Sequence, residues 1–438
     1  MIMASAQRPR LLLFDVPTGP RPGWYLPRLC AEYDLHIMWL LSGDTAKDRA
    51  RAAQFEQWCG HTTMRSQETA SEELTAYAEV WRPEGVLGFG EMAIGPMHTA
   101  AHRLGLPANA PWSIPALRNK QEQRRLLAEA GLPTPRFASV RSLSELRAAV
   151  ASVGLPAILK PKAGVGSMAT FRVDDSADSA DLAGLWTAAC ASYADDPRGG
   201  SAADFLLEEF LVGVSPHTDD RYGAYASVES LVQEGVVQHL AVTDKFPLSP
   251  GFRENGGIMP SVLPGTVTDS LLECAAQAIK AMGITDSGVH TEIMFTEDGP
   301  RVIEVNSRIG GGVTEMLHYC CGYDSVLARA AIATGRPAPP FTPPVRSTGY
   351  FLPQAPQGAT ALTKAPSVAE LLALPPVAEA ELAYAVGDRP LWQQGTPGGT
   401  VARLVGVADS AGPLLELYDQ LKPGRLLDYA SAPGGAEG

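Results

Sequence analysis

The stretch GVHTEIMFTEDGPRVIEVNSRIGGG, residues 288–312, decides the fold of this chain. Two runs rich in β-branched and apolar residues, Val289–Phe295 and Arg301–Ser307, flank the turn residues 297–299, Glu-Asp-Gly. This pattern predicts a β-hairpin. If its loop has three residues with the glycine in the left-handed conformation, Thr296 opposes Pro300 and opposed residue numbers sum to a constant.

In that register one face of the hairpin is polar and acidic. Glu292 faces Glu304 directly, and His290 opposes Asn306 on the same face. Two carboxylates about 4 to 5 Å apart repel by roughly 4 kcal/mol at an effective dielectric constant near 20, so they need a cation or a proton. Magnesium, which prefers oxygen ligands, is the natural partner.

The other face would pair Ile293 with Ile303 and form apolar core. A two-residue loop would instead place Glu292 and Glu304 on opposite faces, where both could simply be solvated. The hairpin alone leaves both interpretations open.

Downstream of the hairpin, Arg308 is followed by Gly310, Gly311 and Gly312. Glycines leave space beside the guanidinium, and arginine suits carboxylate or phosphoryl oxygens. A surface ion pair is the alternative.

Upstream, the expected strand Ile158–Ala163 carries Lys160 and leads into a glycine loop, residues 164–168, before a second strand, Thr170–Val173. Backbone N–H groups of such a loop, together with a lysine, can hold phosphate. An ordinary glycine hairpin is the alternative. A separate pattern at residues 88–93, GxGxxA, is typical of dinucleotide binding, but it lacks the acidic residue expected about 20 positions on.

The 438 residues are 45% hydrophobic and 19% charged, which fits a folded protein of two to four domains. In the first third, Leu11–Val16, Leu35–Leu41 and Gly85–Phe89 alternate with helical stretches, which predicts βα units on a parallel sheet. A polar insert is expected at residues 195–204, and a proline-rich linker at residues 337–344. The tail, residues 431–438, is expected to be disordered.

The net charge of −13 disfavours nucleic acid and acidic membrane surfaces as partners. ATP stays possible as a ligand because local lysines outweigh distant screened charge. The six cysteines form no CxxC pair, so we expect neither zinc nor a disulfide framework, and a reducing cytoplasm fits best. We see no signal-peptide core and no apolar run near the roughly 20 residues of a membrane span.

In chain order, Lys120 after Asn119, Lys160 with its glycine loop, residues 208–211, and the acidic hairpin with Arg308 resemble the ATP-grasp superfamily. Within it the resemblance is to L-amino acid ligases. It implies a multidomain α/β (α+β) ATP-grasp fold with a Rossmann-like pre-ATP-grasp domain first and a small mixed α/β module last. The implied domains are residues 1–116, a lid subdomain 117–205, a central domain 206–340 and the module 341–438.

The resemblance also implies roles for individual residues. Lys120 and Lys160 would bind the phosphates of ATP, and Arg308, with Lys245 as a weaker candidate, would steady an acyl phosphate. The cofactors would be ATP and two magnesium ions, with manganese as a substitute. The remaining implied residues are the phosphate loop Gly164, Gly166, Ser167 and Met168, the adenine hinge Glu208, Glu209, Phe210 and Leu211, the metal ligands Glu292, Glu304 and Asn306, and the substrate residues Glu91, Gly311 and Gly312.

The implied reaction joins a carboxylate to an amine, with amino acids as substrates and ADP and phosphate as products. Residues 246–264, rich in proline and glycine, are expected to form a lid or an ordinary loop. Bicarbonate is disfavoured as a substrate because glycines follow Arg308 where biotin carboxylases carry Gln, Val, Glu and His. A ligase acting on another carboxylate and a catalytically silent nucleotide-binding protein remain alternatives, and a homodimer is left open.

Overall fold

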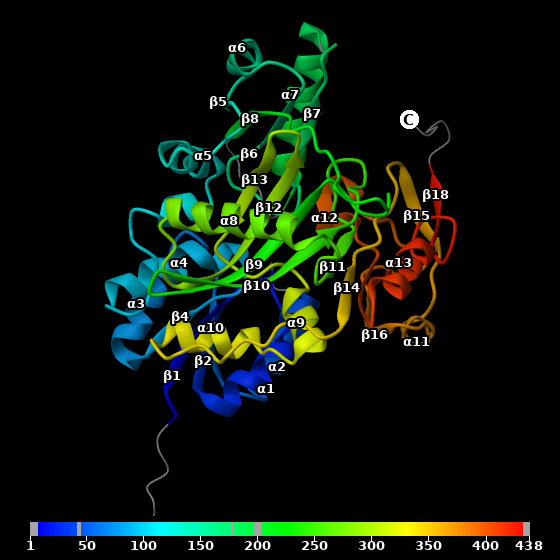
Figure 1. The fold of residues 1–438 in the computed structure, drawn as a ribbon. Coiled ribbons are helices and arrows are strands. Elements are labelled where there is room, and N and C mark those ends of the chain that lie inside the picture. Colours follow the sequence, from blue (N-terminus) through cyan, green and yellow to red (C-terminus); the bar gives the residue numbers. More distant parts are fainter. Residues whose placement is uncertain (1–7, 42–44, 177, 197–202, 432–438) are drawn as a thin grey trace, which may run out of the picture.

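The computed structural model describes residues 8–41, 45–176, 178–196 and 203–431. These residues form four sheets (Figure 1). The N-terminal domain lies at the bottom of the view, the lid subdomain at the top, and the central sheet between them, with the C-terminal module on the right. The sequence prediction of a mixed multidomain fold is confirmed.

The N-terminal sheet is parallel, with strand order β3-β2-β1-β4. The predicted βα units are therefore present, but one strand was missed. That strand, β3, has the sequence GHTTM and buries only Met64, so its apolar signal is weak. The elements of this domain are β1 (Arg10–Asp15), α1 (Pro22–Glu32), β2 (Asp34–Leu40), α2 (Ala46–Glu56), β3 (Gly60–Met64), α3 (Ala70–Trp81), β4 (Gly85–Leu87) and α4 (Glu91–Arg103).

The lid subdomain follows a connecting helix, α5 (Lys120–Glu129), whose N-cap Asn119 accepts hydrogen bonds from two backbone N–H groups. Its sheet is antiparallel, with order β5-β8-β6-β7. Ile158 pairs with Glu208, so the predicted phosphate lysine and the predicted adenine hinge lie on adjacent strands. The elements are β5 (Phe137–Val140), α6 (Leu143–Val153), β6 (Ala157–Pro161), β7 (Phe171–Val173), α7 (Ser179–Asp195) and β8 (Phe205–Glu209). Much of the predicted polar insert, residues 197–202, lies outside the described residues.

The central sheet has eight strands in the order β13-β12-β9-β10-β11-β14-β17-β16. It runs from the acidic hairpin into the C-terminal module, so strands on both sides of the predicted boundary at residue 340 share one sheet. Its elements and those packed on it are β9 (Tyr225–Gln233), β10 (Val236–Lys245), β11 (Gly256–Met259), α8 (Gly265–Ala281), β12 (Ser287–Thr296), β13 (Gly299–Asn306), α9 (Val313–Cys321), α10 (Ser325–Ala333), β14 (Ser347–Phe351), β16 (Val377–Leu382) and β17 (Ala402–Ala408).

The rest of the C-terminal module surrounds the far edge of this sheet (Figure 1). Its remaining elements are the strand pair β15 (Ala359–Lys364) and β18 (Asp428–Ser431), and the helices α11 (Val368–Leu372), α12 (Gly395–Gly399) and α13 (Ala411–Gln420). Ser431 belongs to β18 and is therefore not part of a disordered tail, while residues 432–438 lie outside the described residues. No described helix is long and apolar enough to cross a membrane.

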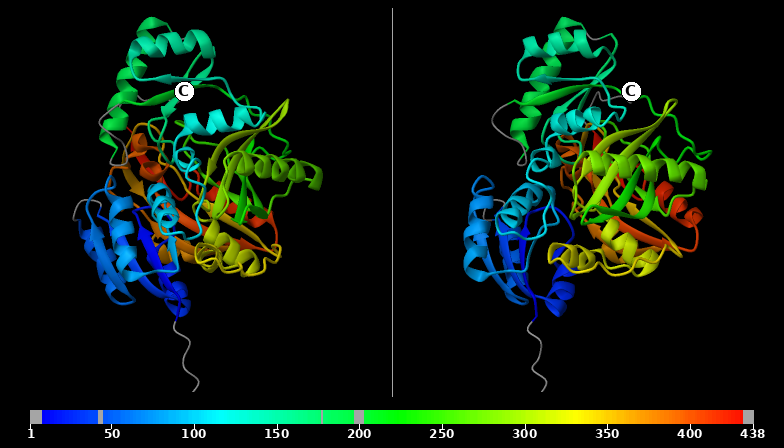
Figure 2. Two further views of the ribbon diagram at one scale, coloured as in Figure 1. Left: turned by 90° about the vertical axis from the view of Figure 1, so that its left-hand side faces the viewer. Right: turned by 60° about the vertical axis from the view of Figure 1, so that its left-hand side comes forward.

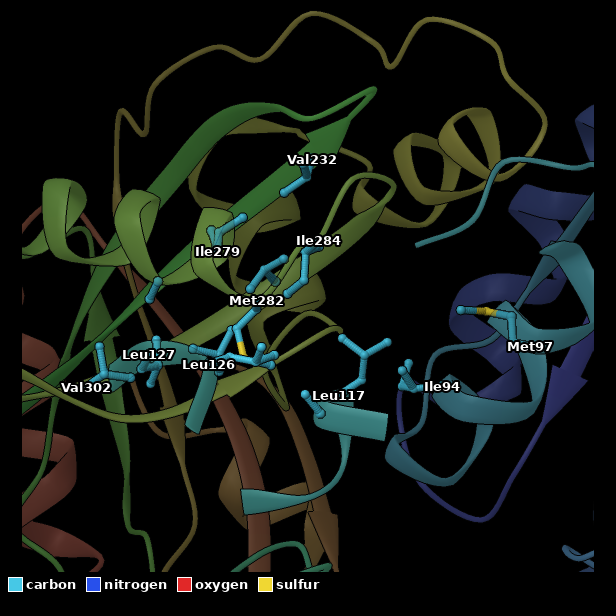
Figure 3. Close-up of a cluster of buried hydrophobic side chains, with 14 of the residues drawn as sticks. Ile94, Met97, Leu117, Leu126, Leu127, Val232, Ile279, Met282, Ile284 and Val302 are labelled. Atoms are coloured by element: carbon cyan, nitrogen blue, oxygen red, sulfur yellow. The ribbon is translucent and has the colours of Figure 1, made fainter. Parts of the chain in front are cut away.

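One hydrophobic cluster joins the N-terminal domain to the central domain (Figure 3). The cluster extends from Ile94 and Met97 of α4 to Leu127 of α5, Met282 after α8, and Val302 of β13, and all are at most 3% exposed. Burying a large apolar side chain contributes roughly 1.5 to 3 kcal/mol. The cluster therefore fixes the helix and the strand that carry the predicted site against the N-terminal domain, whose sheet lies beside the central one in both views of Figure 2.

Candidate active site

The turn of the acidic hairpin differs from the prediction. Its loop has two residues, Glu297 and Asp298, and Thr296 pairs with Gly299 instead of Pro300. Ile293 pairs with Val302 instead of Ile303. The predicted three-residue loop is therefore wrong.

The register nevertheless recovers within the hairpin, because β13 contains a bulge between the partners of Glu292 and Ile293. Ile303 is the extra residue, and beyond it Glu292 pairs with Glu304 and His290 with Asn306, as predicted. The bulge exchanges the roles of two apolar residues. Val302 is 3% exposed in the core, whereas Ile303 lines the cavity beside the hairpin.

The bulge is held by a side chain that sequence reasoning did not single out. Arg124 of α5 is 1% exposed, and its Nη2 donates to the carbonyl oxygen of Ile303 at 2.6 Å. Its Nε and Nη2 also donate to the two carboxylate oxygens of Glu208 at 2.8 and 3.2 Å. Arg124 thus ties the lid subdomain to the acidic hairpin.

A cavity of ≈ 690 Å³ lies between the lid subdomain, the hairpin, the N-terminal loops and the C-terminal module. All of the predicted site residues line it. At one end, which we call the nucleotide end, are Lys120, Lys160, the loop 164–168, Glu292 and Glu304.

The cations of the nucleotide end each contact a carboxylate. Lys120 Nζ lies 2.8 Å from Glu304 Oε1 and donates to the carbonyl oxygen of Gly164 at 3.0 Å. Lys160 Nζ lies 2.5 Å from Glu208 Oε2. Both lysines are about 9% exposed, so their charges face the cavity rather than bulk water.

Two more cations are paired in the middle of the cavity. Lys245 Nζ lies 2.8 Å from Glu254 Oε2, and Arg308 Nε lies 2.8 Å from Glu91 Oε2. Glu91 is the first residue of α4, where a carboxylate interacts favourably with the N-terminal end of the helix dipole, and it also orients the arginine.

The electrostatics keep these groups ionised. Burial would raise the pKa of Glu208, but Arg124 and Lys160 outweigh it and lower the pKa to about 2. Burial likewise opposes ionisation of Glu304, yet Lys120, Lys160 and Arg308 hold its pKa below the ordinary value.

His290 and Glu229 stand behind the acidic pair. His290 Nδ1 contacts Glu229 Oε1 at 2.5 Å, and its Nε2 contacts Glu292 Oε1 at 3.1 Å. Burial would lower the pKa of His290, but the two carboxylates raise it to about 9. Glu229 is fully buried and also accepts the backbone N–H of Gly310 at 3.1 Å. The imidazolium therefore fixes Glu292 in its orientation.

The residues present fit a magnesium ion. Glu292 and Glu304 face each other, both line the cavity, and Asn306 adds an amide two residues on. The two carboxylates repel each other, and the charge of Glu304 acts to raise the pKa of Glu292. Magnesium is commonly held by one or two carboxylates and completes its coordination with water and phosphate oxygens, so two carboxylates and an amide suit it. In the described ranges no cluster of three or more His, Cys, Asp or Glu side chains suited to a metal occurs.

The glycine loop is held by contacts from distant segments. Ser167 Oγ donates to the carbonyl oxygen of Phe252 at 2.5 Å, and the N–H of Thr396 in α12 donates to the carbonyl oxygen of Gly166 at 2.9 Å. A Cβ on Gly395 would lie 2.3 Å from that same oxygen. The loop is therefore seated on the C-terminal module, a contact with no local sequence signal.

The remaining predicted residues take varied positions. The segment 246–264 is not a single loop, because Gly256 and Gly257 begin the buried central strand β11. In the adenine hinge, the N–H of Glu209 donates to the carbonyl oxygen of Arg136 at 2.9 Å, so this N–H is already used within the protein. Gly311 has open space where a Cβ would lie, whereas a Cβ on Gly312 would lie 2.3 Å from the ring of Tyr350.

Residues 153–316 match the family described as the ATP-grasp domain. These residues form an ATP-grasp domain, and the predicted resemblance to the ATP-grasp superfamily is confirmed.

Two relatives and one solved structure show which ligases this chain resembles. The chain is 27% identical over 257 residues to alanine–anticapsin ligase of Bacillus subtilis (strain 168), 58% of this chain and 54% of that protein. It is 26% identical over 319 residues to carnosine synthase 1 of Homo sapiens, 69% of this chain and 37% of that protein. The aligned part thus spans about half, or less, of these relatives. The structure of an L-amino acid ligase from Bacillus licheniformis superposes with a TM-score of 0.74 at 20% identity, covering 98% of this chain and 100% of that one.

Proposed function

We propose that this protein is an ATP-dependent carboxylate–amine ligase that forms an amide or peptide bond between two amino acids and releases ADP and phosphate. The observation that carries the proposal is the opposed pair Glu292 and Glu304, which shares one cavity with two buried lysines, a glycine loop and Arg308. The amino acid ligases among its relatives support the choice of substrates.

The nucleotide end would receive ATP. Lys120 and Lys160 would exchange their present carboxylate contacts for phosphate oxygens, and the backbone N–H groups of the loop 164–168 would face the β and γ phosphates. Residues 208–211 would hold the adenine. When bound, two magnesium ions held by Glu292, Glu304 and Asn306 would neutralise charge on the phosphates.

In the first step a carboxylate oxygen of one amino acid attacks the γ phosphorus in line. The bond between that phosphorus and the bridging oxygen breaks, ADP leaves, and an acyl phosphate remains. Phosphoryl transfer of this kind depends mainly on positioning and on neutralising the charge that spreads over the phosphoryl oxygens. Lys120, Lys160 and Arg308 supply that charge here.

In the second step the deprotonated amine of the other amino acid attacks the acyl carbon. The carbon–oxygen bond to phosphate breaks, and the amine loses its second proton as the amide forms. Arg308, held by Glu91 at 2.8 Å, would stabilise the oxygens of the tetrahedral state and of the leaving phosphate. Lys245, held by Glu254 at 2.8 Å, would reach the same phosphate or the carboxylate.

A ligase for a different carboxylate is the second candidate, because pocket geometry does not by itself define the acid. The test is to incubate the protein with ATP, magnesium and pooled amino acids, and to follow both nucleotide and product. ADP with phosphate supports the proposal, whereas AMP with pyrophosphate would indicate adenylation and overturn the mechanism. Mass spectrometry of the same mixture separates a dipeptide from other amides.

We further infer action in the cytoplasm, since the six cysteines are free thiols in the structure. Light scattering on the same purified sample would show whether the protein is the homodimer that the sequence leaves open.

A further inference from the structure

The cavity has a second end, built from segments far apart in the chain. We call it the α9 end, defined by Arg21, Glu315, Tyr350, Glu379 and Glu381, all of which line the cavity. Arg21 comes from the loop before α1, Glu315 from the first turn of α9, and the other residues from β14 and β16. Glu315 is the residue on which the inference rests.

All but one of the acidic groups at the α9 end are satisfied by protein partners. Arg21 forms ion pairs with Glu379 and with Glu381, the latter at 3.5 Å. Glu379 also accepts the hydroxyl of Tyr319 at 3.0 Å. These carboxylates therefore have little need of a ligand.

Glu315 is different. It is 6% exposed and lines the cavity, and its carboxylate accepts a hydrogen bond from its own backbone N–H. Within the described ranges no other residue forms a hydrogen bond or an ion pair with that carboxylate. The charges that act on it at longer range are Glu379, which opposes its ionisation, and Arg21 and Arg28, which favour it. Those two arginines have nearer carboxylate partners, Arg28 being 3.0 Å from Asp324. A buried carboxylate without a cation beside it is costly to ionise unless a ligand supplies the opposite charge.

The position of Glu315 assigns it to one of the two substrates. Glu315 lies in the first turn of α9, three residues beyond Gly312, the last of the glycines that follow Arg308. Those glycines and Glu315 line the same cavity. The glycines leave room beside Arg308 for a second substrate, so we infer that the amine donor occupies this part of the cavity.

We propose that Glu315 selects the amine donor by forming an ion pair with a cationic side chain, so that the second substrate is a basic amino acid. This inference rests on the proposed function and adds the class of one substrate. The reacting α-amine lies near Arg308 in this arrangement, and only a side chain extends to Glu315. Tyr350, packed against Gly312, forms part of the wall beside that side chain.

The test compares L-lysine with L-norleucine, which has the same carbon chain without the terminal amine. With a small amino acid as the acid substrate, the ratio of kcat/KM for lysine to that for norleucine should be well above one. In Glu315→Gln this ratio should fall about 10- to 100-fold, the loss expected for a buried charged hydrogen bond. In Glu315→Met, which should fold because an apolar side chain replaces a desolvated acid, the ratio should fall below one.

The control is Glu416→Gln, an exposed acid on α13, which should leave the ratio unchanged. Equal use of lysine and norleucine by the unaltered protein would overturn the inference. An equal fall in both rates in Glu315→Gln would also overturn it, because Glu315 would then act on the α-amine. In both cases the ligase function would stand.

Calorimetry gives a readout that does not need turnover. With ADP and magnesium present, L-lysine should bind the unaltered protein at least 10-fold more tightly than L-norleucine, and Glu315→Gln should remove the difference. If no amino acid pair yields ADP but lysine binds in this way, the proposed function fails. The ion pair between Glu315 and a cationic side chain would still be supported. Equal binding of both amino acids would refute the assignment.

Discussion

The two ends of the cavity are built from charged residues in different ways. At the nucleotide end Lys120 and Lys160 contact carboxylates within 2.8 Å. At the α9 end Glu315 is buried with no such partner. The nucleotide end can keep its shape without ligand because its charges neutralise one another, whereas the α9 end leaves one charge for a ligand to satisfy.

This difference between the two ends fits the proposed ligase reaction. A triphosphate brings several charges and must displace existing ion pairs, so the site that receives it is balanced beforehand. Selection of an amine donor requires one charge that is satisfied only by the right substrate. Changes at the two ends should therefore affect different measurements.

The largest effect is expected for Glu304→Gln, which removes one of the two opposed carboxylates. Turnover should fall by about 10² to 10³, because charge on the transferring phosphoryl group loses a fixed counter-ion site. Steady-state release of ADP measures this. The exposed turn acid Glu297 provides the control, and Glu297→Gln should retain full rate. Unchanged turnover in Glu304→Gln would remove the metal assignment.

The second-largest effect is expected for Arg124→Ala, which should lower the stability of the fold. It leaves Glu208 buried with Lys160 as its remaining charged partner, and it frees the carbonyl of the bulged Ile303, so the free energy of unfolding should fall by about 3 kcal/mol. Urea denaturation measures the loss. Arg125→Ala removes a neighbouring but exposed arginine with surface ion pairs, and it should leave the free energy of unfolding nearly unchanged. Equal losses in the two variants would show that Arg124 does not brace the hairpin.

Gly395→Ala should weaken ATP binding at the nucleotide end. Gly395 has φ +72°, and an added Cβ would lie 2.3 Å from the carbonyl oxygen of Gly166, so the glycine loop must shift. We expect the KM for ATP to rise about 10-fold with a smaller change for the amino acids. The helical Gly412 offers a matched control with no close neighbour. An unaltered KM in Gly395→Ala would mean that α12 does not seat the loop.

The smallest effect concerns the stability of the ligand-free protein at the α9 end. Burial raises the pKa of Glu315, so the folded protein holds this proton more tightly than the unfolded chain does. Stability from this group is therefore present below about pH 4.3, the unfolded pKa, and is lost as pH rises toward the folded pKa. Glu315→Gln should thus be more stable than the unaltered protein by on the order of 1 kcal/mol at pH 7, with the difference vanishing near pH 4. A gain that does not depend on pH would contradict the unpaired state of Glu315.

The comparison also shows what the sequence could predict. Glu292 and Glu304 lie on one hairpin, and Lys160 lies beside its own glycine loop, so local patterns were enough to place them. The loop length was nonetheless wrong, because the bulge at Ile303 depends on Arg124, a residue 179 positions earlier. Thr396 and Glu379 meet the cavity only through packing of the C-terminal module, and no spacing in the sequence marks that contact.

The central claim is that a carboxylate is activated by phosphoryl transfer in the cavity of Glu292, Glu304 and Arg308. It can be tested with an amino acid whose carboxylate carries oxygen-18, incubated with ATP, magnesium and an amine donor. One labelled oxygen should appear in the released inorganic phosphate, and the other should remain in the amide. Label in AMP, or amide formation with unlabelled phosphate, would contradict the account.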